Sequence, residues 1–293
     1  MRHDVTFPIL PDLSTLDFSR TTDLQNLTRE RIHHLFGGNE DAYIDEFVDA
    51  IQDFFAGRQS GYQPMDTPYH DIAHTLQATL CLVELLHNRH IAEATPRLDA
   101  GHFKLVLIAE LFHDIGYLKL TGDTQGSGAK YTHEHEKRSC NFARAFLEQR
   151  DWPSNDIKTI ENLIKATGPT ANLSRIEFDS EIEHELGKMV CTADYIGQMS
   201  DPNYPDKLEA LFNEFKESYQ YQGIPENEWP FASYEQLLKS TPDFWGIFMQ
   251  KKLSVECSDL CRYLKHPISG ENPYLESIEK NLVEIQKRIT RLP

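Results

Sequence analysis

Two short histidine-containing strings place the strongest constraint on how this chain can fold. The first reads YHDIAH at residues 69–74, and the second reads LFHD at residues 111–114. A four-residue spacing puts His70 and His74 on one face of a helix, if a helix forms there. The second string ends an almost wholly apolar segment, so its His-Asp pair is expected to be buried. Because a buried charge without a partner costs several kcal/mol or more, a metal ion is the simplest partner for these groups.

The rest of the chain has a helical pattern. Apolar residues recur at three- and four-residue spacing at 43–55, 103–112, 182–197 and 208–215, and no useful stretch alternates as a strand would. This pattern predicts an all-α fold in a single compact multi-helix bundle. The segment 121–132 holds three glycines and is expected to form a mobile loop beside the site.

We expect an N-terminal segment and helix at 1–40, a core at 41–220, and C-terminal helices packing on the core at 221–293. The last of these helices carries apolar residues spaced three, four, three and four apart at 275–289. Such a seam covers about two heptads, fewer than a coiled coil usually needs. A helix docked on its own domain is therefore favoured, and a homodimer contact through the C-terminal helix is the alternative.

The net charge of −17 disfavours a nucleic acid polymer as partner, because binding to one relies on clustered lysine and arginine. A small anionic substrate remains compatible, since bound cations can reverse the sign of a site. The sequence has no run long enough to cross a membrane and no apolar signal at its start. The five cysteines form no C-x-x-C pair, as in a reduced protein of the cytoplasm.

The metal ligands have to come from a small set of polar residues that lie beside apolar helical positions. Asp194, for example, is a carboxylate on an otherwise apolar helix face, where a buried cap or salt bridge is the alternative. Imidazole and carboxylate ligands of this kind suit Zn, Mg, Mn or Fe. The candidate residues are His70, His74, His113, Asp114, His133, His135 and Asp194.

The order His, His-Asp, His, Asp on successive helices resembles the HD superfamily of metal-dependent phosphohydrolases. The string at 69–75 is similar to the Y-H-N-x-x-H-A signature of class I 3',5'-cyclic-nucleotide phosphodiesterases, and the resemblance spans about 62–215. It implies that His70 is the general acid. It further implies that the first metal ion is bound by His74, His113, Asp114 and Asp194. In this resemblance Asp114 also bridges to a second divalent ion.

The chain also departs from the phosphodiesterase pattern. The final histidine of the H-D-x-x-H motif is Tyr117 here, and Asp71 replaces the signature asparagine. His135 lies four residues before Ser139, as does a second-metal ligand in other HD proteins, so we expect His135 rather than His133 to hold the second ion. An imidazole-rich second site favours iron or manganese.

Four other residues are candidates for contact with the substrate or for supporting the ligands. Glu110 lies one turn before Asp114 and could orient a ligand histidine, although an ordinary salt bridge is the alternative. Gln250 is the candidate for the base-binding glutamine of the phosphodiesterases. Tyr117 and Gln198 complete the group.

These features predict a metal-dependent phosphodiesterase that acts on a small, cyclic or otherwise nucleotide-like phosphoester. A hydroxide bridging the two ions is the expected nucleophile, and His70 is expected to protonate the leaving oxygen. Two alternatives stay open. One is an HD-type di-iron oxygenase with the same ligands, and the other is a metal-bound sensing domain without turnover.

Overall fold

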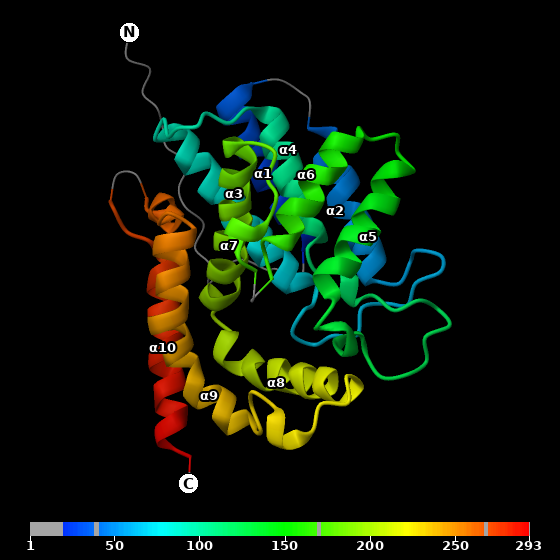
Figure 1. The fold of residues 1–293 in the computed structure, drawn as a ribbon. Coiled ribbons are helices and arrows are strands. Elements are labelled where there is room, and N and C mark those ends of the chain that lie inside the picture. The colour runs from blue at the N-terminus through cyan, green and yellow to red at the C-terminus, as the bar shows by residue number, and fades with distance from the viewer. Residues whose placement is uncertain (1–19, 38–40, 169–170, 267–268, 293) are drawn as a thin grey trace.

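Helices account for almost all the regular structure of the chain (Figure 1). The computed structural model describes residues 20–37, 41–168, 171–266 and 269–292, and it confirms the all-α prediction. An isolated antiparallel bridge between Tyr62 and Leu120 is the one β feature in this part of the chain. The α-helices are, in order, α1 (Thr21–Phe36), α2 (Ala42–Phe55), α3 (Ile72–Ile91), α4 (Ala100–Phe112), α5 (His135–Glu148), α6 (Ser154–Lys165), α7 (Glu181–Ser200), α8 (Tyr204–Tyr221), α9 (Tyr234–Asp243) and α10 (Pro273–Thr290).

Short helical turns connect several of these helices. The turn η1 (Ile115–Tyr117) follows α4 directly, and η2 (Gly128–Tyr131) precedes α5. Two π-helical turns follow α9, within the region 221–293 where C-terminal helices were expected. These two π-helical turns are η5 (Phe244–Met249) and η6 (Lys252–Glu256). The other short helical turns are η3 (Leu173–Arg175), η4 (Glu226–Glu228) and η7 (Leu260–Leu264).

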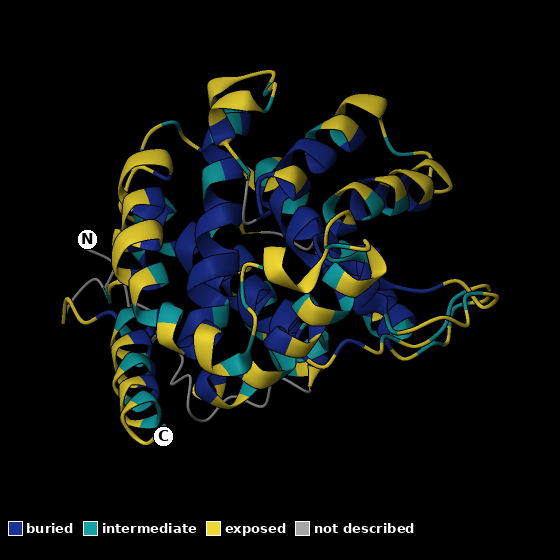
Figure 2. Cartoon of the chain, turned by 60° about the horizontal axis from the view of Figure 1, so that its bottom comes forward, coloured by how far each residue is buried: buried dark blue, intermediate teal, exposed yellow. Residues whose placement is uncertain are grey.

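The centre of the bundle consists of α3, α4 and α7. Every residue of α4 from 106 to 112 and every residue of α7 from 189 to 197 is buried. A helix that is apolar on all sides has to be enclosed by others, and Figure 2 shows such buried helices inside a shell with exposed outer faces. The polar side chains on these central helices are thereby held in the interior.

The start of α3 differs from the expected helix in one respect. Asp71 is its N-cap, and its Oδ1 accepts a hydrogen bond of 2.8 Å from the backbone N–H of His74. Aspartate is a favoured cap because it satisfies an amide that the helix leaves unpaired. The helix therefore begins at Ile72, and the expectation that His70 and His74 share a helix face was wrong. His70 lies in the turn before the helix.

The glycine-containing segment 121–132 is held by side chains rather than left without contacts. Ser127 donates to Glu217 through both its backbone N–H, at 2.5 Å, and its hydroxyl, at 2.6 Å. The amine of Lys130 pairs with Asp123 inside the segment. These contacts give no support to the expected mobility of this loop.

The C-terminal helix α10 packs on its own chain. Its buried Asn281 donates to the backbone oxygens of Met199, at 2.9 Å, and Asp201, at 2.7 Å, at the end of α7. Ile278 and Ile285 of the apolar seam are fully buried. Much of the seam is thus used within the chain, while a homodimer contact stays a prediction.

The crossing of α3 and α7 depends on Gly197. A Cβ atom at this position would lie 2.8 Å from the Cα of Ala78, which is backbone and cannot rotate away. We expect Gly197→Ala to lower the free energy of unfolding by about 1–3 kcal/mol, because overpacking forces the two helices apart. Chemical denaturation measures this change. Gly246→Ala, where a Cβ meets nothing within 4 Å, is the control and should not destabilise.

Candidate metal centre

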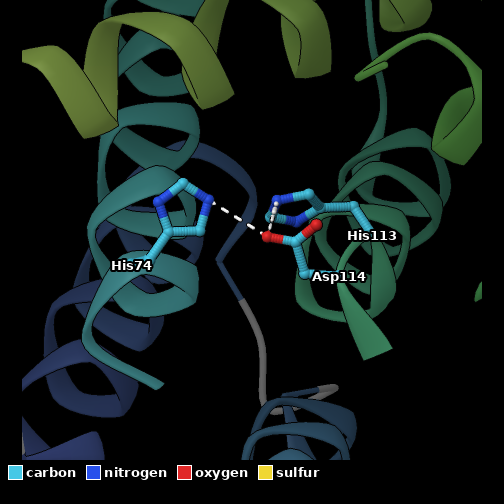
Figure 3. A group of neighbouring side chains, drawn as sticks. All are labelled: His74, His113 and Asp114. Atoms are coloured by element: carbon cyan, nitrogen blue, oxygen red, sulfur yellow. Dashed lines mark ion pairs between the residues drawn. The ribbon is translucent and has the colours of Figure 1, made fainter. Parts of the chain in front are cut away.

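Four polar side chains from α3, α7 and the end of α4 meet in the interior. His74 Nε2 lies 3.1 Å from Asp114 Oδ2 and 3.5 Å from Asp194 Oδ1. His113 Nε2 lies 3.1 Å from the same oxygen of Asp114 and 3.6 Å from Asp194 Oδ1. Figure 3 shows the two imidazoles turned toward Asp114 from different helices. In the described residues, His74, His113 and Asp114 form the one group of this kind whose ligand atoms lie within 4.8 Å of one another.

The local backbone directs these groups inward. His113 is the C-cap of α4, and Asp114 follows with φ −105° and ψ 3°, in the sparsely occupied bridge region where many active-site residues lie. His113 Nδ1 is 2.7 Å from the backbone oxygen of Glu110. Because a carbonyl oxygen can only accept, Nδ1 carries the proton and a neutral His113 presents the lone pair of Nε2 to Asp114. Metal-binding histidines are commonly oriented in this way.

The atoms at the centre are short of partners. His113 Nε2 and Asp114 Oδ2 are both buried, and neither makes a hydrogen bond within the described structure despite their separation of 3.1 Å. Two lone pairs at this distance repel one another unless a cation lies between or beside them. Buried polar atoms without hydrogen bonds are rare and require an explanation. A divalent ion held by His74, His113, Asp114 and Asp194 is such an explanation, so these residues fit a metal.

Protons would have to take the place of the ion in metal-free protein. Burial alone would lower the pKa of His74, but its contacts with Asp114 and Asp194 raise that pKa to about 9. Burial likewise opposes ionisation of Asp114, yet the charge of His113 holds the pKa of that carboxyl well below its usual value. The surroundings of these groups therefore favour positive charge, which protons supply in the metal-free protein.

This balance predicts a pH-dependent stability of the metal-free protein. A raised pKa means that the stabilisation by protonated His74 is complete below its ordinary pKa of 6.5 and is lost as the pH rises through about 9. A shift of this size corresponds to about 3 kcal/mol. Denaturant unfolding of chelated protein should show this loss, and a saturating divalent ion should remove it. Equal stability of the chelated protein below pH 6.5 and above about pH 9 would contradict the assignment.

Asp114 faces a further imidazole on its other side. His135, the first residue of α5, places Nε2 at 3.5 Å from Asp114 Oδ1, whereas His74 and His113 approach Oδ2. Its Nδ1 donates a 2.7 Å hydrogen bond to the backbone oxygen of Thr132, so its Nε2 is also free to bind a cation. His133 is exposed and precedes the helix. Of the two histidines, His135 is the one that the fold brings to the centre.

His70 lies in the same cavity with a carboxylate behind it. Its Nδ1 is 2.5 Å from Oε2 of Glu214 on α8, and the other oxygen of Glu214 accepts a 2.6 Å hydrogen bond from the backbone N–H of Tyr69. Glu214 is almost completely buried, with 2% of its side chain exposed. This pair leaves the Nε2 of His70 available for a proton transfer.

The centre opens into a cavity of about 260 Å³, whose outer part is apolar. Gln198 lines it, and its Oε1 accepts a 2.8 Å hydrogen bond from the hydroxyl of Tyr69. The side chains that have already been described and that line the cavity are His70, His74, His113, Asp114, His135 and Asp194. The other lining residues are Tyr117, Thr132, Thr167, Tyr195, Tyr204, Leu208, Leu211, Phe215, Phe231, Leu237, Ser240, Thr241 and Phe244.

Two candidates from the sequence are located elsewhere. Gln250 is exposed after the π-helical turn η5 and does not line the cavity. Glu110 is fully buried behind His113 and orients it through its backbone oxygen, while neither carboxylate oxygen has a hydrogen-bond partner in the described residues. Burial raises the pKa of the Glu110 carboxyl to about 8.

Sequence reasoning missed Glu214 and the aromatic wall from α8 and α9. Glu214 is one of 46 acidic residues, and its neighbours in the sequence give no sign that it is buried. Its position depends on α8 packing against the turn that precedes α3, which is a tertiary contact. Phe231 and Phe244 belong to a region without clear periodicity.

The arrangement of helices is that of phosphodiesterase domains. The chain is similar to the solved phosphodiesterase domain of the Salpingoeca rosetta rhodopsin phosphodiesterase, at 15% identity and a TM-score of 0.60, over 96% of this chain and 91% of that domain. A second structure, the phosphodiesterase domain of the RhoPDE fusion protein from the same choanoflagellate, matches at 15% identity and a TM-score of 0.59, over 95% and 93%. These likenesses establish the fold.

The chain belongs to the Npun_R2479-like family, whose sequence model matches residues 127–287, more than half of the chain. No curated protein matches it. Among the helices of the described residues, none is both long and apolar enough to cross a membrane.

Proposed function

We propose that this protein is a metal-dependent phosphohydrolase, a phosphodiesterase that cleaves a small nucleotide-like phosphoester, cyclic nucleotides included. The observation that carries the proposal is the position of Asp114. Its two oxygens face different imidazoles, His74 and His113 on one side and His135 on the other. This is the arrangement that a carboxylate bridging two ions requires. The solved domains that share the fold are phosphodiesterase domains by name, which agrees with this chemistry.

The ions would be held by residues that fit them. His74, His113, Asp114 and Asp194 would hold the first, and Asp114 with His135 would hold the second. Zn, Mg, Mn and Fe all accept such ligands. When bound, two such ions supply a water molecule of lowered pKa and offset the charge of the phosphoryl oxygens.

The protein side chains supply the proton and the surroundings. His70 donates its Nε2 proton to the leaving alkoxide, whose own pKa is too high for it to depart unprotonated. Glu214 accepts from Nδ1, which fixes the orientation of the ring. The apolar wall of α8 and α9 encloses the organic part of the ester and keeps bulk water away from the reacting groups.

The assignment of the second ion is tested by metal content. We expect wild-type protein to bind two divalent ions per chain and His135→Ala to bind one, because the variant leaves Asp114 as the only side-chain ligand on that side. Elemental analysis of the dialysed protein measures the ratio. His133→Ala is the matched control and should keep both ions, since His133 is exposed. Two ions per chain in His135→Ala would remove His135 from the ligand set.

The same ligands would also suit a di-iron oxygenase, and the His135 imidazole is the observation that favours this second candidate. A release assay over cyclic nucleotides, nucleoside monophosphates and dinucleotides, run with each metal and with or without oxygen, separates the two. The phosphodiesterase predicts metal-dependent product release that is unaffected by removing oxygen. Turnover only with iron and oxygen would favour the oxygenase, and metal binding without any turnover would favour a sensing domain.

A further inference from the structure

Tyr117 occupies the position at which the motif H-D-x-x-H would end in histidine. Its side chain is 1% exposed, it lines the cavity, and it follows the candidate bridging residue Asp114 by three residues. Its hydroxyl faces Thr132, and no other described residue is a hydrogen-bond partner for it. The part of Tyr117 that contacts the candidate site residues is its aromatic ring.

Two imidazoles stack on that ring. The centroid of His70 lies 4.5 Å from the centroid of Tyr117 with an interplanar angle of 18°, and His135 lies at 4.7 Å with an angle of 17°. The centroids of His70 and His135 are 6.3 Å apart. Both imidazoles therefore contact the ring of Tyr117 with their planes nearly parallel to it.

The turn that carries Tyr117 is fixed to the start of α5. The backbone N–H of Gly116 donates to Ser139 Oγ at 2.9 Å, and the Ser139 hydroxyl donates to the backbone oxygen of His113 at 2.6 Å. Arg138 donates to the backbone oxygens of Gly116, at 2.7 Å, and Leu118, at 2.8 Å. A Cβ at position 116 would meet the backbone oxygen of His135 at 2.0 Å, so no side chain fits between η1 and α5.

From this geometry we infer that Tyr117 is a positioning residue, a flat platform that sets the distance and angle between the proton donor His70 and the second-metal ligand His135. The inference rests on the proposed function for its catalytic meaning. His70 comes from the turn before α3 and His135 from α5, and Tyr117 is the side chain that contacts both rings face to face. By holding the two rings in place, Tyr117 aligns the proton on His70 with the leaving oxygen of a phosphoester bound next to His135.

The test compares Tyr117→Leu, which removes the flat face, with Tyr117→Phe, which keeps it. For an ester with a poor alkoxide leaving group, Tyr117→Leu should lose roughly a hundredfold in kcat with little change in KM. The loss should be much smaller for a nitrophenyl ester, whose leaving group needs no proton. Affinity for the second ion should fall roughly 10–100-fold, as when the partner that orients a ligand histidine is removed. Tyr117→Phe should keep the wild-type kcat with both esters and the wild-type affinity for the second ion.

The matched control is Tyr274→Leu in α10, a tyrosine that is also 1% exposed and whose hydroxyl has no partner in the described residues. It should lower stability without changing leaving-group dependence or metal affinity. If Tyr117→Leu does not fold, Tyr117→Met keeps an apolar side chain without a flat face and takes its place. Equal losses with both esters and unchanged affinity for the second ion would overturn the inference. The metal titration tests the effect of Tyr117 on His135 even if the protein hydrolyses no phosphoester. Absence of hydrolysis in the wild-type protein would count against the proposed function and would leave this test of Tyr117 in place.

Discussion

Replacing Asp114 with alanine should remove both ions and lower turnover roughly a thousandfold or more. The expected effect is the largest in the protein because both oxygens of this carboxylate face candidate ligands. A metal ion contributes several kcal/mol of stabilisation to a charged transition state, and this substitution would remove two. Elemental analysis and the hydrolysis rate measure the two effects separately.

The control for Asp114→Ala is Asp201→Ala. Asp201 is buried at the end of α7, 3% exposed, and pairs with Lys207 at 2.7 Å away from the cavity lining. Its removal should cost stability but leave two ions and the rate in place. If Asp114→Ala retained two ions per chain, Asp114 could not be the bridge between them.

The second large effect is expected at His70. His70→Ala should keep its metal content and fold, and it should lose roughly 10²–10⁴-fold in turnover of an ester with a poor alkoxide leaving group. A nitrophenyl ester should lose much less, because proton donation matters only where charge builds up on the leaving oxygen. Steady-state rates for the two esters give the comparison.

Glu214 makes this prediction sharper. Because Glu214 acts on the reaction through His70, the double variant His70→Ala/Glu214→Gln should be about as slow as His70→Ala alone. Multiplying losses would show that the two residues act independently. Equal large losses with both esters, accompanied by loss of metal, would instead make His70 a ligand.

The helices of the core follow from the sequence because burial and periodicity agree there. Residues 43–55 and 182–197 form α2 and most of α7, since an apolar stripe at helical spacing has to be buried against other helices. The region from 221 to 272 could not be predicted in this way. Pro242 lies inside α9, and the π-helical turns that follow shift the spacing of buried residues.

The candidate site was predictable where its residues lie on the central helices. His74, His113, Asp114 and Asp194 are polar groups within apolar segments, and the fold brings them together. Glu214 was not predictable, because α8 contributes it through a contact between distant parts of the chain. Gln250 was placed in the site by analogy alone, and the π-helical turn before it leaves it exposed.

The most direct test of the account is hydrolysis by metal-loaded protein in water enriched in oxygen-18, with a cyclic nucleotide as the first substrate and the same panel of phosphoesters after it. Chelation should stop the reaction, and one oxygen-18 atom should enter the phosphate group of the product, because solvent attacks phosphorus. Oxygen-18 in the newly formed hydroxyl group would contradict attack at phosphorus. Absence of metal-dependent hydrolysis for every ester with Zn, Mg, Mn and Fe would contradict the proposed function itself.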